Sequence, residues 1–268
     1  MNLNELVVLI KGGGEVASGV AHRLFHAHFR VCLTEIPHPQ AVSRGVTFSE
    51  AVYDNEKEIE GVTGVLVDSL SGIRQAWASN RIPVIVDPEA KIKDTLKPDV
   101  LVDAVMAKKN LGTKITDAPL VIGLGPGFRA GHDVHMVVET NNTEQLGRVI
   151  LDGEAKANTG IPIAVGGLTS ERVIHSDGSG LFRTVSKVGD TVKAGEVIGS
   201  VGGREIKSPL GGVVRALIRD GIQVEPGTKL LEIDSGAGEK VCYRIRARIR
   251  AISGGVLEAI MRRFNAWL

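Results

Sequence analysis

A glycine-rich turn near the start of the chain constrains the fold most. Residues 6–10 form a short, continuous apolar run, which is typical of a strand buried on both faces. Gly12, Gly14 and Ala17 follow with the spacing G-x-G-x-x-A, and a helical pattern comes next. A second strand pattern then ends on Glu35, 23 residues after Gly12. This arrangement is typical of a dinucleotide-binding βαβ unit.

Each of these residues has a physical role in nucleotide binding. Gly12 allows the tight turn, and Gly14 lets a pyrophosphate approach the N-terminus of the helix. Ala17 permits close packing of the helix on the strand. Glu35 can accept hydrogen bonds from a ribose 2′-hydroxyl, and it would repel a 2′-phosphate. An NAD-like ligand is therefore expected rather than an NADP-like one.

The neighbouring residues leave alternatives open. Gly13 completes the turn, and Lys11 stands either where a phosphate can reach it or as a solvated lysine. Glu15 lies in the first helical turn, where it favours the helix dipole but repels a phosphate. The turn could also serve packing alone, without a ligand.

Helix and strand patterns continue to alternate. Strands are predicted over 62–68, 82–88, 98–105 and 118–128, and a helix over 71–80. This order predicts an α/β fold with a Rossmann-like, mostly parallel sheet.

Several polar and glycine residues would gather at one edge of this sheet. Ligands of such sheets bind outside the carboxyl ends of the strands. The residues expected there are Glu35, Asp87, Asp103 and the loop Gly125, Pro126, Gly127, Phe128. Each carboxylate taken alone is better explained as a cap or a solvated strand end, and their shared location is the stronger argument for a site.

Two histidine patterns bear on metal binding. Residues 132–135 read His-Asp-Val-His; on a strand, Asp133 and His135 share a face and His132 points away. This favours a polar ligand contact by Asp133 or His135 over a metal site. His22 and His26 are spaced i,i+4 on the first helix, but no acidic partner accompanies them, so no metal is predicted.

A repeat with an offset of 32 residues marks a second module. Residues 188–201, VGDTVKAGEVIGSV, align with residues 220–233, DGIQVEPGTKLLEI. The repeat resembles the biotinyl/lipoyl-type barrel-sandwich hybrid. Carrier domains of that type hold a modifiable lysine on the hairpin between the halves, commonly flanked by methionine. The hairpin here reads VGGREIKSP, so neither biotin nor lipoate is predicted, and the module is expected to be a structural or docking piece.

The C-terminal residues combine two patterns. A half-exposed strand is predicted over 243–252, YRIRARIRAI, and a helix after it with Ser253 as its cap. The expected domains are residues 1–165 for nucleotide binding, 166–240 for the barrel-sandwich module, and 241–268 for a strand and helix packing on the body.

Composition narrows the function classes. The formal net charge is +1, so neither nucleic acid nor a membrane surface is an expected partner. Two cysteines cannot form a disulfide framework, and no signal peptide or apolar span is recognised. A cytoplasmic protein is expected.

Six segments in combination resemble the YqeB-type accessory proteins of selenium-dependent molybdenum hydroxylases: IKGGGEVASGVAHRL, TEIPHPQAVSRGVTFSEAVYD, VDAVMAKKNLGT, PLVIGLGPGFRAGHDVHMVVET, LGRVILDGEAKANTGIP and GGVLEAIM. The first domain is also distantly similar to the Rossmann domain of XdhC-type molybdenum-cofactor insertion chaperones. Two segments differ from what is expected in relatives. Residues 141–145, NNTEQ, stand where a basic stretch is expected, and YRIRARIRAI stands where a form containing Ser-Asp-Lys is expected.

The resemblance implies a role in maturing a molybdenum hydroxylase, with the apoenzyme as partner. The ligand would be molybdopterin dinucleotide or an adenine nucleotide, bound at Gly12 to Gly14 and Glu35, with Gly125 to Phe128 and Asp133 completing the cleft. An NAD-linked oxidoreductase and a scaffold with an empty turn are the alternatives. Whether a reaction is catalysed stays open.

Overall fold

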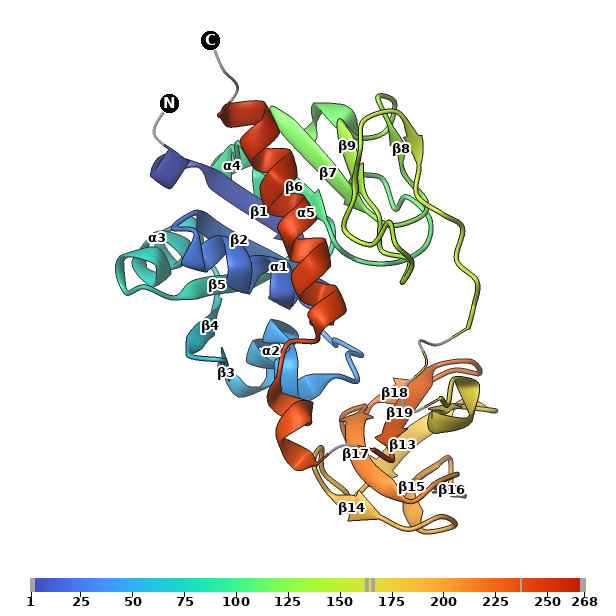
Figure 1. Cartoon of the computed structure of the whole chain (residues 1–268). Helices are drawn as coiled ribbons and strands as arrows, with labels where there is room; N and C mark the ends of the chain where they lie inside the picture. Colours follow the sequence, from blue (N-terminus) through green and yellow to red (C-terminus); the bar gives the residue numbers. More distant parts are fainter. Residues whose placement is uncertain (1–2, 162–163, 165–166, 237, 266–268) are drawn as a thin grey trace. The chain divides into compact units, whose positions relative to one another are not determined.

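The computed structural model describes residues 3–161, 164, 167–236 and 238–265. The chain forms two compact units (Figure 1). The first comprises Met1–Pro39, Thr47–Asn158 and Ile245–Leu268; the second comprises Gln40–Val46 and Thr159–Arg244. The domain boundary expected at 165–166 lies outside the described residues.

A nine-stranded sheet organises the first unit. Its strand order is β10-β9-β7-β6-β1-β2-β5-β4-β3. The parallel strands are β1 (Val7–Lys11), β2 (Arg30–Glu35), β4 (Val62–Val67), β5 (Ile82–Val86), β6 (Val100–Asp103), β7 (Leu120–Leu124) and β9 (Met136–Val138). The antiparallel edge strands are β3 (Glu56–Ile59) and β10 (Val149–Ile150). The predicted mixed α/β class with a mostly parallel sheet is confirmed.

The order of the strands reverses at β1. The chain leaves β1 through α1 (Glu15–His26) to β2 on one side, and it later returns as β6 on the other side. Val8, Leu9 and Ile10 of β1 are fully buried, as the continuous apolar run predicts. The carboxyl ends of β1 and β6 therefore flank a topological switch point, where α/β sheets bind ligands.

The described part of the first unit also contains the α-helices α2 (Ala51–Asp54), α3 (Leu70–Ala78), α4 (Lys93–Leu96) and α5 (Ala247–Phe264). Ile73 of α3 joins a core cluster with Leu9, Cys32 and Leu101 of the sheet. A small sheet pairs β8 (Arg129–Ala130) with β11 (Gly153–Glu154). Among the residues described, no helix is both long enough and apolar enough to span a membrane.

The C-terminal helix is confirmed, but the strand expected before it is wrong. A 3-10 helix, η6 (Glu239–Tyr243), is followed by α5 from Ala247. The i, i+3, i+7 spacing of Ile249, Ile252 and Val256 fits a helix rather than a strand, and all three lie on one buried face. Ser253 is not the cap: it lies in mid-helix and its hydroxyl donates to the carbonyl of Ile249 at 2.7 Å.

Close packing of α5 on α1 explains why this segment forms a helix and not the expected strand. A Cβ at Gly19 of α1 would lie 2.1 Å from Cγ2 of Ile249, so the glycine makes room for this side chain. α5 also contacts β7, β9 and β10 (Figure 1). Tertiary contact of this kind outweighs a local strand pattern.

Two four-stranded antiparallel sheets form the second unit. One contains β12 (Val173–His175), β19 (Lys229–Asp234), β17 (Gly212–Leu217) and β14 (Thr191–Val192). The other contains β16 (Arg204–Lys207), β15 (Val197–Val201), β13 (Gly180–Thr184) and β18 (Gln223–Val224). The two copies of the repeat place equivalent strands in different sheets: β14 pairs with β17, and β18 pairs with β13.

Candidate functional site

A buried ionic cluster joins the carboxyl ends of β1 and β6. Lys11 Nζ lies 3.3 Å from Asp103 Oδ2 and donates to the hydroxyl of Thr113 at 2.7 Å. That hydroxyl donates in turn to Asp103 at 2.6 Å. Lys11 is 8% exposed and Asp103 is 2% exposed. Both residues thus hold the sheet together beneath the glycine turn, and the structure does not present Lys11 to a surface ligand.

The three glycines of the turn serve different purposes. Gly12 has a φ of +94°, and a Cβ there would lie 3.2 Å from the carbonyl oxygen of Ala104. A Cβ at Gly13 would lie 3.1 Å from the Glu35 carboxylate and 3.2 Å from the amide nitrogen of Ser49. At Gly14 no described atom outside its two chain neighbours lies within 4 Å of that position. The protein's own packing therefore requires the first two glycines, whereas Gly14 borders open space.

Glu35 holds the turn in place. Its Oε2 accepts a hydrogen bond from the Gly13 amide at 2.7 Å, and its Oε1 accepts one from the Ile36 amide at 2.8 Å. Burial raises the pKa of Glu35, and these two hydrogen bonds oppose the rise. A carboxylate offers about four lone-pair sites, so capacity remains for a ribose hydroxyl.

Sequence reasoning missed a guanidinium beside the turn. Arg246, which precedes α5, places Nε 3.1 Å from Oε1 of Glu15 in the first turn of α1. The pair offsets the negative charge that would repel a phosphate at this helix end. Arg248 anchors the same segment by donating to the carbonyl of Thr140 at 2.9 Å. The basic run RIRARIR was the available signal, but its position in space depends on the docking of α5.

The second glycine loop packs closely against other loops. A Cβ at Gly125 would lie 2.4 Å from Oγ1 of Thr140, and one at Gly127 would lie 2.6 Å from Cα of Lys109. Pro126 is half-buried. Phe128 is 5% exposed and lies in the core, so its ring does not face a surface cleft.

The segment 104–109, after β6, contacts both glycine loops. Ala104 and Val105 lie against Gly12, and Lys108 and Lys109 lie against Gly127. The structure thus brings the two predicted loops together through a third loop.

Asp133 lies in a turn, so the face-sharing of Asp133 and His135 that a strand would give does not apply. The turn connects β8 to β9, and Asp133 closes it by accepting the Arg129 amide at 2.9 Å. The hydrogen bond with His132 is the main reason why the pKa of Asp133 is lowered. His135 Nδ1 accepts the Val121 amide at 3.0 Å. Within the described ranges, no group of three or more His, Cys, Asp or Glu could hold a metal.

Apolar side chains are exposed at the carboxyl edge of the sheet. Ile36 follows β2, Val86 ends β5 and Val105 follows β6, and they are 42%, 39% and 41% exposed. Asp87 stays at this edge, where its amide donates to the Glu35 carbonyl at 2.9 Å and its carboxylate accepts the Ile92 amide at 2.7 Å. The edge therefore combines apolar side chains with a glycine turn.

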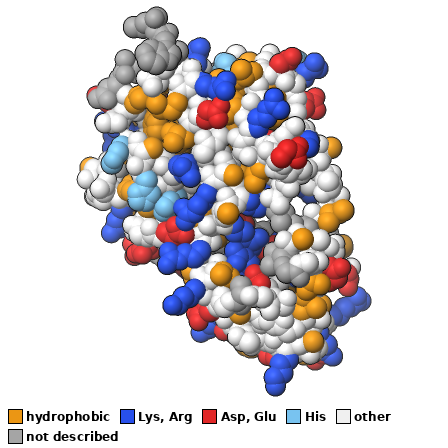
Figure 2. Space-filling view, viewed as in Figure 1, with side chains coloured by type: hydrophobic (Ala, Val, Ile, Leu, Met, Phe, Trp, Pro, Cys, Tyr) orange, Lys and Arg blue, Asp and Glu red, His pale blue; other side chains and the backbone are white. Residues whose placement is uncertain are grey.

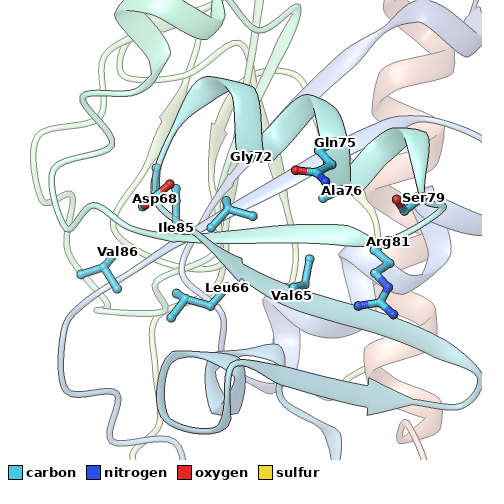
Figure 3. Close-up of a pocket in the computed structure, with 11 residues that line it drawn as sticks. Val65, Leu66, Asp68, Gly72, Gln75, Ala76, Ser79, Arg81, Ile85 and Val86 are labelled. Atoms are coloured by element: carbon cyan, nitrogen blue, oxygen red, sulfur yellow. The ribbon is translucent and has the colours of Figure 1, made fainter.

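A cavity of about 820 Å³ lies beside α3, over β4 and β5 (Figure 3). Val65, Val67 and Ile85 give it apolar walls, and Gln75 and Arg81 lie on its polar side. None of the site residues predicted from the sequence lines it.

Comparison with curated proteins identifies a relative by sequence. No protein-family model matches the chain. The "Uncharacterized protein YqeB" of Escherichia coli (strain K12) is 46% identical over 255 residues. The match covers 95% of this chain and 47% of YqeB, so the chain spans about half the length of this curated relative.

Solved structures resemble the chain weakly. The ectoine utilization protein EutE (DoeB) from Ruegeria pomeroyi, with product bound, is 12% identical, with 86% of this chain and 85% of that chain covered and a TM-score of 0.26. A succinylglutamate desuccinylase from Silicibacter sp. TM1040 is 13% identical, with 85% and 84% covered and a TM-score of 0.27. Similarities at these scores carry no argument about function. The sequence similarity to YqeB, by contrast, extends over nearly the whole of this chain.

Proposed function

We propose that this protein is an accessory factor that binds molybdopterin dinucleotide and helps to mature a selenium-dependent molybdenum hydroxylase. The observation that carries the ligand proposal is the open space at Gly14, directly before a helix of 12 residues at the switch point of the sheet. The first amides of a helix lack partners within it and attract anions. A pyrophosphate oxygen can approach Gly14, because no described residue other than its chain neighbours comes within 4 Å of its Cβ position.

The surroundings suit the other parts of such a ligand. Ile36, Val86 and Val105 offer apolar contact to a planar ring system at the edge of the sheet. Glu35 stands at the end of β2, where a ribose hydroxyl is expected.

The local charges also favour a phosphorylated ligand. Arg246 pairs with Glu15 at the start of α1. Lys108 and Lys109 are exposed and lie against the second glycine loop. Basic side chains near a helix N-terminus strengthen the attraction of a diphosphate.

The maturation role rests on the family resemblance of the six sequence segments, since the relative YqeB is itself uncharacterized. An NAD-linked oxidoreductase needs a general acid or base beside the nicotinamide. Lys11 and Asp103 are titratable groups below the turn, but they bind each other and Thr113 in the interior. This arrangement favours binding and transfer of a cofactor over hydride chemistry.

The decisive variant is Gly14→Ala. Its φ of −67° is ordinary for alanine and no atom obstructs the new methyl group, so the fold should be unaffected. The methyl group would occupy the space proposed for the pyrophosphate. Gly178→Ala, in the second unit, is the matched control, since its Cβ position is equally open.

Thermal stability is followed while the wild type and both variants are titrated with molybdopterin dinucleotide, NAD, ATP and CTP. A ligand at 100 times its dissociation constant adds about 2.7 kcal/mol. Molybdopterin dinucleotide should stabilise the wild type and Gly178→Ala far more than Gly14→Ala. Equal stabilisation of all three would refute the site, and stabilisation by NAD alone would favour the oxidoreductase. Native mass spectrometry with an apo molybdenum hydroxylase tests the partner, and absence of a complex would contradict the maturation role.

A further inference from the structure

A second cavity, of about 330 Å³, lies between α1 and α5. Its lining includes His22, Arg23, His26, Ile245, Arg250 and Leu257. Figure 2 shows imidazole and Lys or Arg side chains gathered on the face where these two helices lie. His22 is eight residues beyond Gly14, about 12 Å along the helix axis, so the cavity is separate from the glycine turn.

His22 is a buried imidazole with an unsatisfied nitrogen. It is 7% exposed, and its ring is hydrogen-bonded to the backbone of Glu60. Within the described part of the chain, its Nε2 has no hydrogen-bond partner. Buried polar atoms without partners are rare in folded proteins, and they often mark the place of a bound group.

Cationic side chains dominate the surroundings of this ring. The rings of His22 and His26 are 4.6 Å apart. Arg23 donates to the carbonyl of Arg250 at 3.3 Å, and the Arg250 guanidinium lies 2.6 Å from the carboxylate of Glu60. Glu60 also accepts the Ile245 amide at 2.9 Å. Since a guanidinium has five donors, both arginines retain capacity for an anion.

We propose that this cavity binds a small tetrahedral dianion, either free or as the phosphate of a small monoester. Arg23 and Arg250 would hold its oxygens, and His22 would donate from Nε2 in its protonated form. The volume lies at the lower end of the range for small-molecule sites, which suits such a group with a short carbon chain.

The proposal predicts that one proton is taken up from solvent with the anion. In the free protein, burial first, then the charges of His26 and Arg250, lower the pKa of His22, while the Glu60 backbone and side chain oppose this. A dianion beside the ring favours the imidazolium and accepts its Nε2 hydrogen. Affinity should therefore rise as the pH falls.

Isothermal titration with sodium sulfate tests this directly. Sulfate is fully ionised between about pH 6 and about pH 8, so any pH dependence belongs to the protein. At constant ionic strength, the wild type should bind sulfate up to about tenfold more tightly for each unit of lower pH. Two buffers with different ionisation enthalpies should report proton uptake.

Two variants and one control separate the possible outcomes. His22→Asn should remove the pH dependence, and Arg23→Gln, at a half-buried position, should weaken binding at every pH. His28→Asn is the control, because His28 lies outside the lining and its φ of 65° is well tolerated by asparagine. If His22→Asn does not fold, the effect of Arg23→Gln on sulfate affinity still tests the proposal.

The outcomes are distinct. No sulfate binding by the wild type, or binding that is independent of pH and unchanged in Arg23→Gln, would overturn the proposal. Tighter binding of glycerol 3-phosphate than of sulfate would identify a monoester as the ligand, and equal binding would identify the free anion.

Discussion

Gly254 and Gly255 are neighbours in α5, and alanine should affect stability differently at the two positions. Apart from its chain neighbours and the backbone of its own helix, no described atom lies within 4 Å of a Cβ at Gly254. At Gly255 a Cβ would lie 2.0 Å from the carbonyl oxygen of Gly147 and 2.9 Å from Cγ1 of Val138. A backbone oxygen cannot rotate away as a side chain can, so α5 must shift to accept Gly255→Ala.

The expected stability difference between the two variants can be estimated because their gain in helix propensity is the same and cancels. Each substitution gains about 1 kcal/mol from the higher helix propensity of alanine. The difference between the two variants is therefore the steric cost alone, about 1–3 kcal/mol for an overpacked site. Gly254→Ala should be more stable than the wild type, and Gly255→Ala should be less stable than Gly254→Ala.

Thermal unfolding followed by circular dichroism measures this difference. In a chain of this size, each kcal/mol corresponds to roughly 2–4 °C in Tm. Equal Tm values for Gly254→Ala and Gly255→Ala would refute the packing of α5 against residue 147.

Three further predictions concern buried ionisable groups. Lys11→Met leaves the Asp103 carboxylate without its cation and should lower the free energy of unfolding, measured by urea titration, by about 3–5 kcal/mol. Adding Asp103→Asn to this variant should restore part of the lost stability. An unchanged urea midpoint in Lys11→Met would disprove the buried pair. Burial raises the pKa of the Cys32 thiol, so iodoacetamide should label Cys32 only after unfolding, as mass spectrometry can show; labelling of the native protein would contradict this. Burial raises the pKa of Glu35 above its ordinary 4.5, so protonation of this carboxyl favours the folded state. The stability of the wild type relative to Glu35→Gln should therefore fall as the pH rises from about 4.5 through the raised pKa. A difference in Tm between the two proteins that stays constant with pH would contradict this prediction.

The candidate site was partly predictable because some of its parts are local. The glycine turn, the helix after it and Glu35 lie within one βαβ unit, where sequence spacing determines spatial proximity. The role of each glycine was not predictable. Gly12 is required by Ala104 and Gly13 by Ser49, whereas Gly14 borders open space, and these contacts come from segments far along the chain.

The pairing of charged residues was equally hidden. Lys11 meets Asp103 and Thr113 because β1 and β6 are neighbours in the sheet, although more than 90 residues separate them in sequence. Glu15 meets Arg246 because α5 docks on α1. The sequence supplied both charges of each pair, but their separation in space depends on topology.

Local patterns in the sequence determined the alternation of strands and helices, the mostly parallel sheet and the repeat of the second unit, because periodicity and turn residues act over a few positions. Tertiary structure decided that residues 247–264 form a helix, since Gly19 and Gly147 create the surface that accepts α5. It also created the α1–α5 cavity around His22, from residues more than 200 positions apart. Such contacts depend on long-range packing, in which each side chain is constrained by partners that no local pattern specifies.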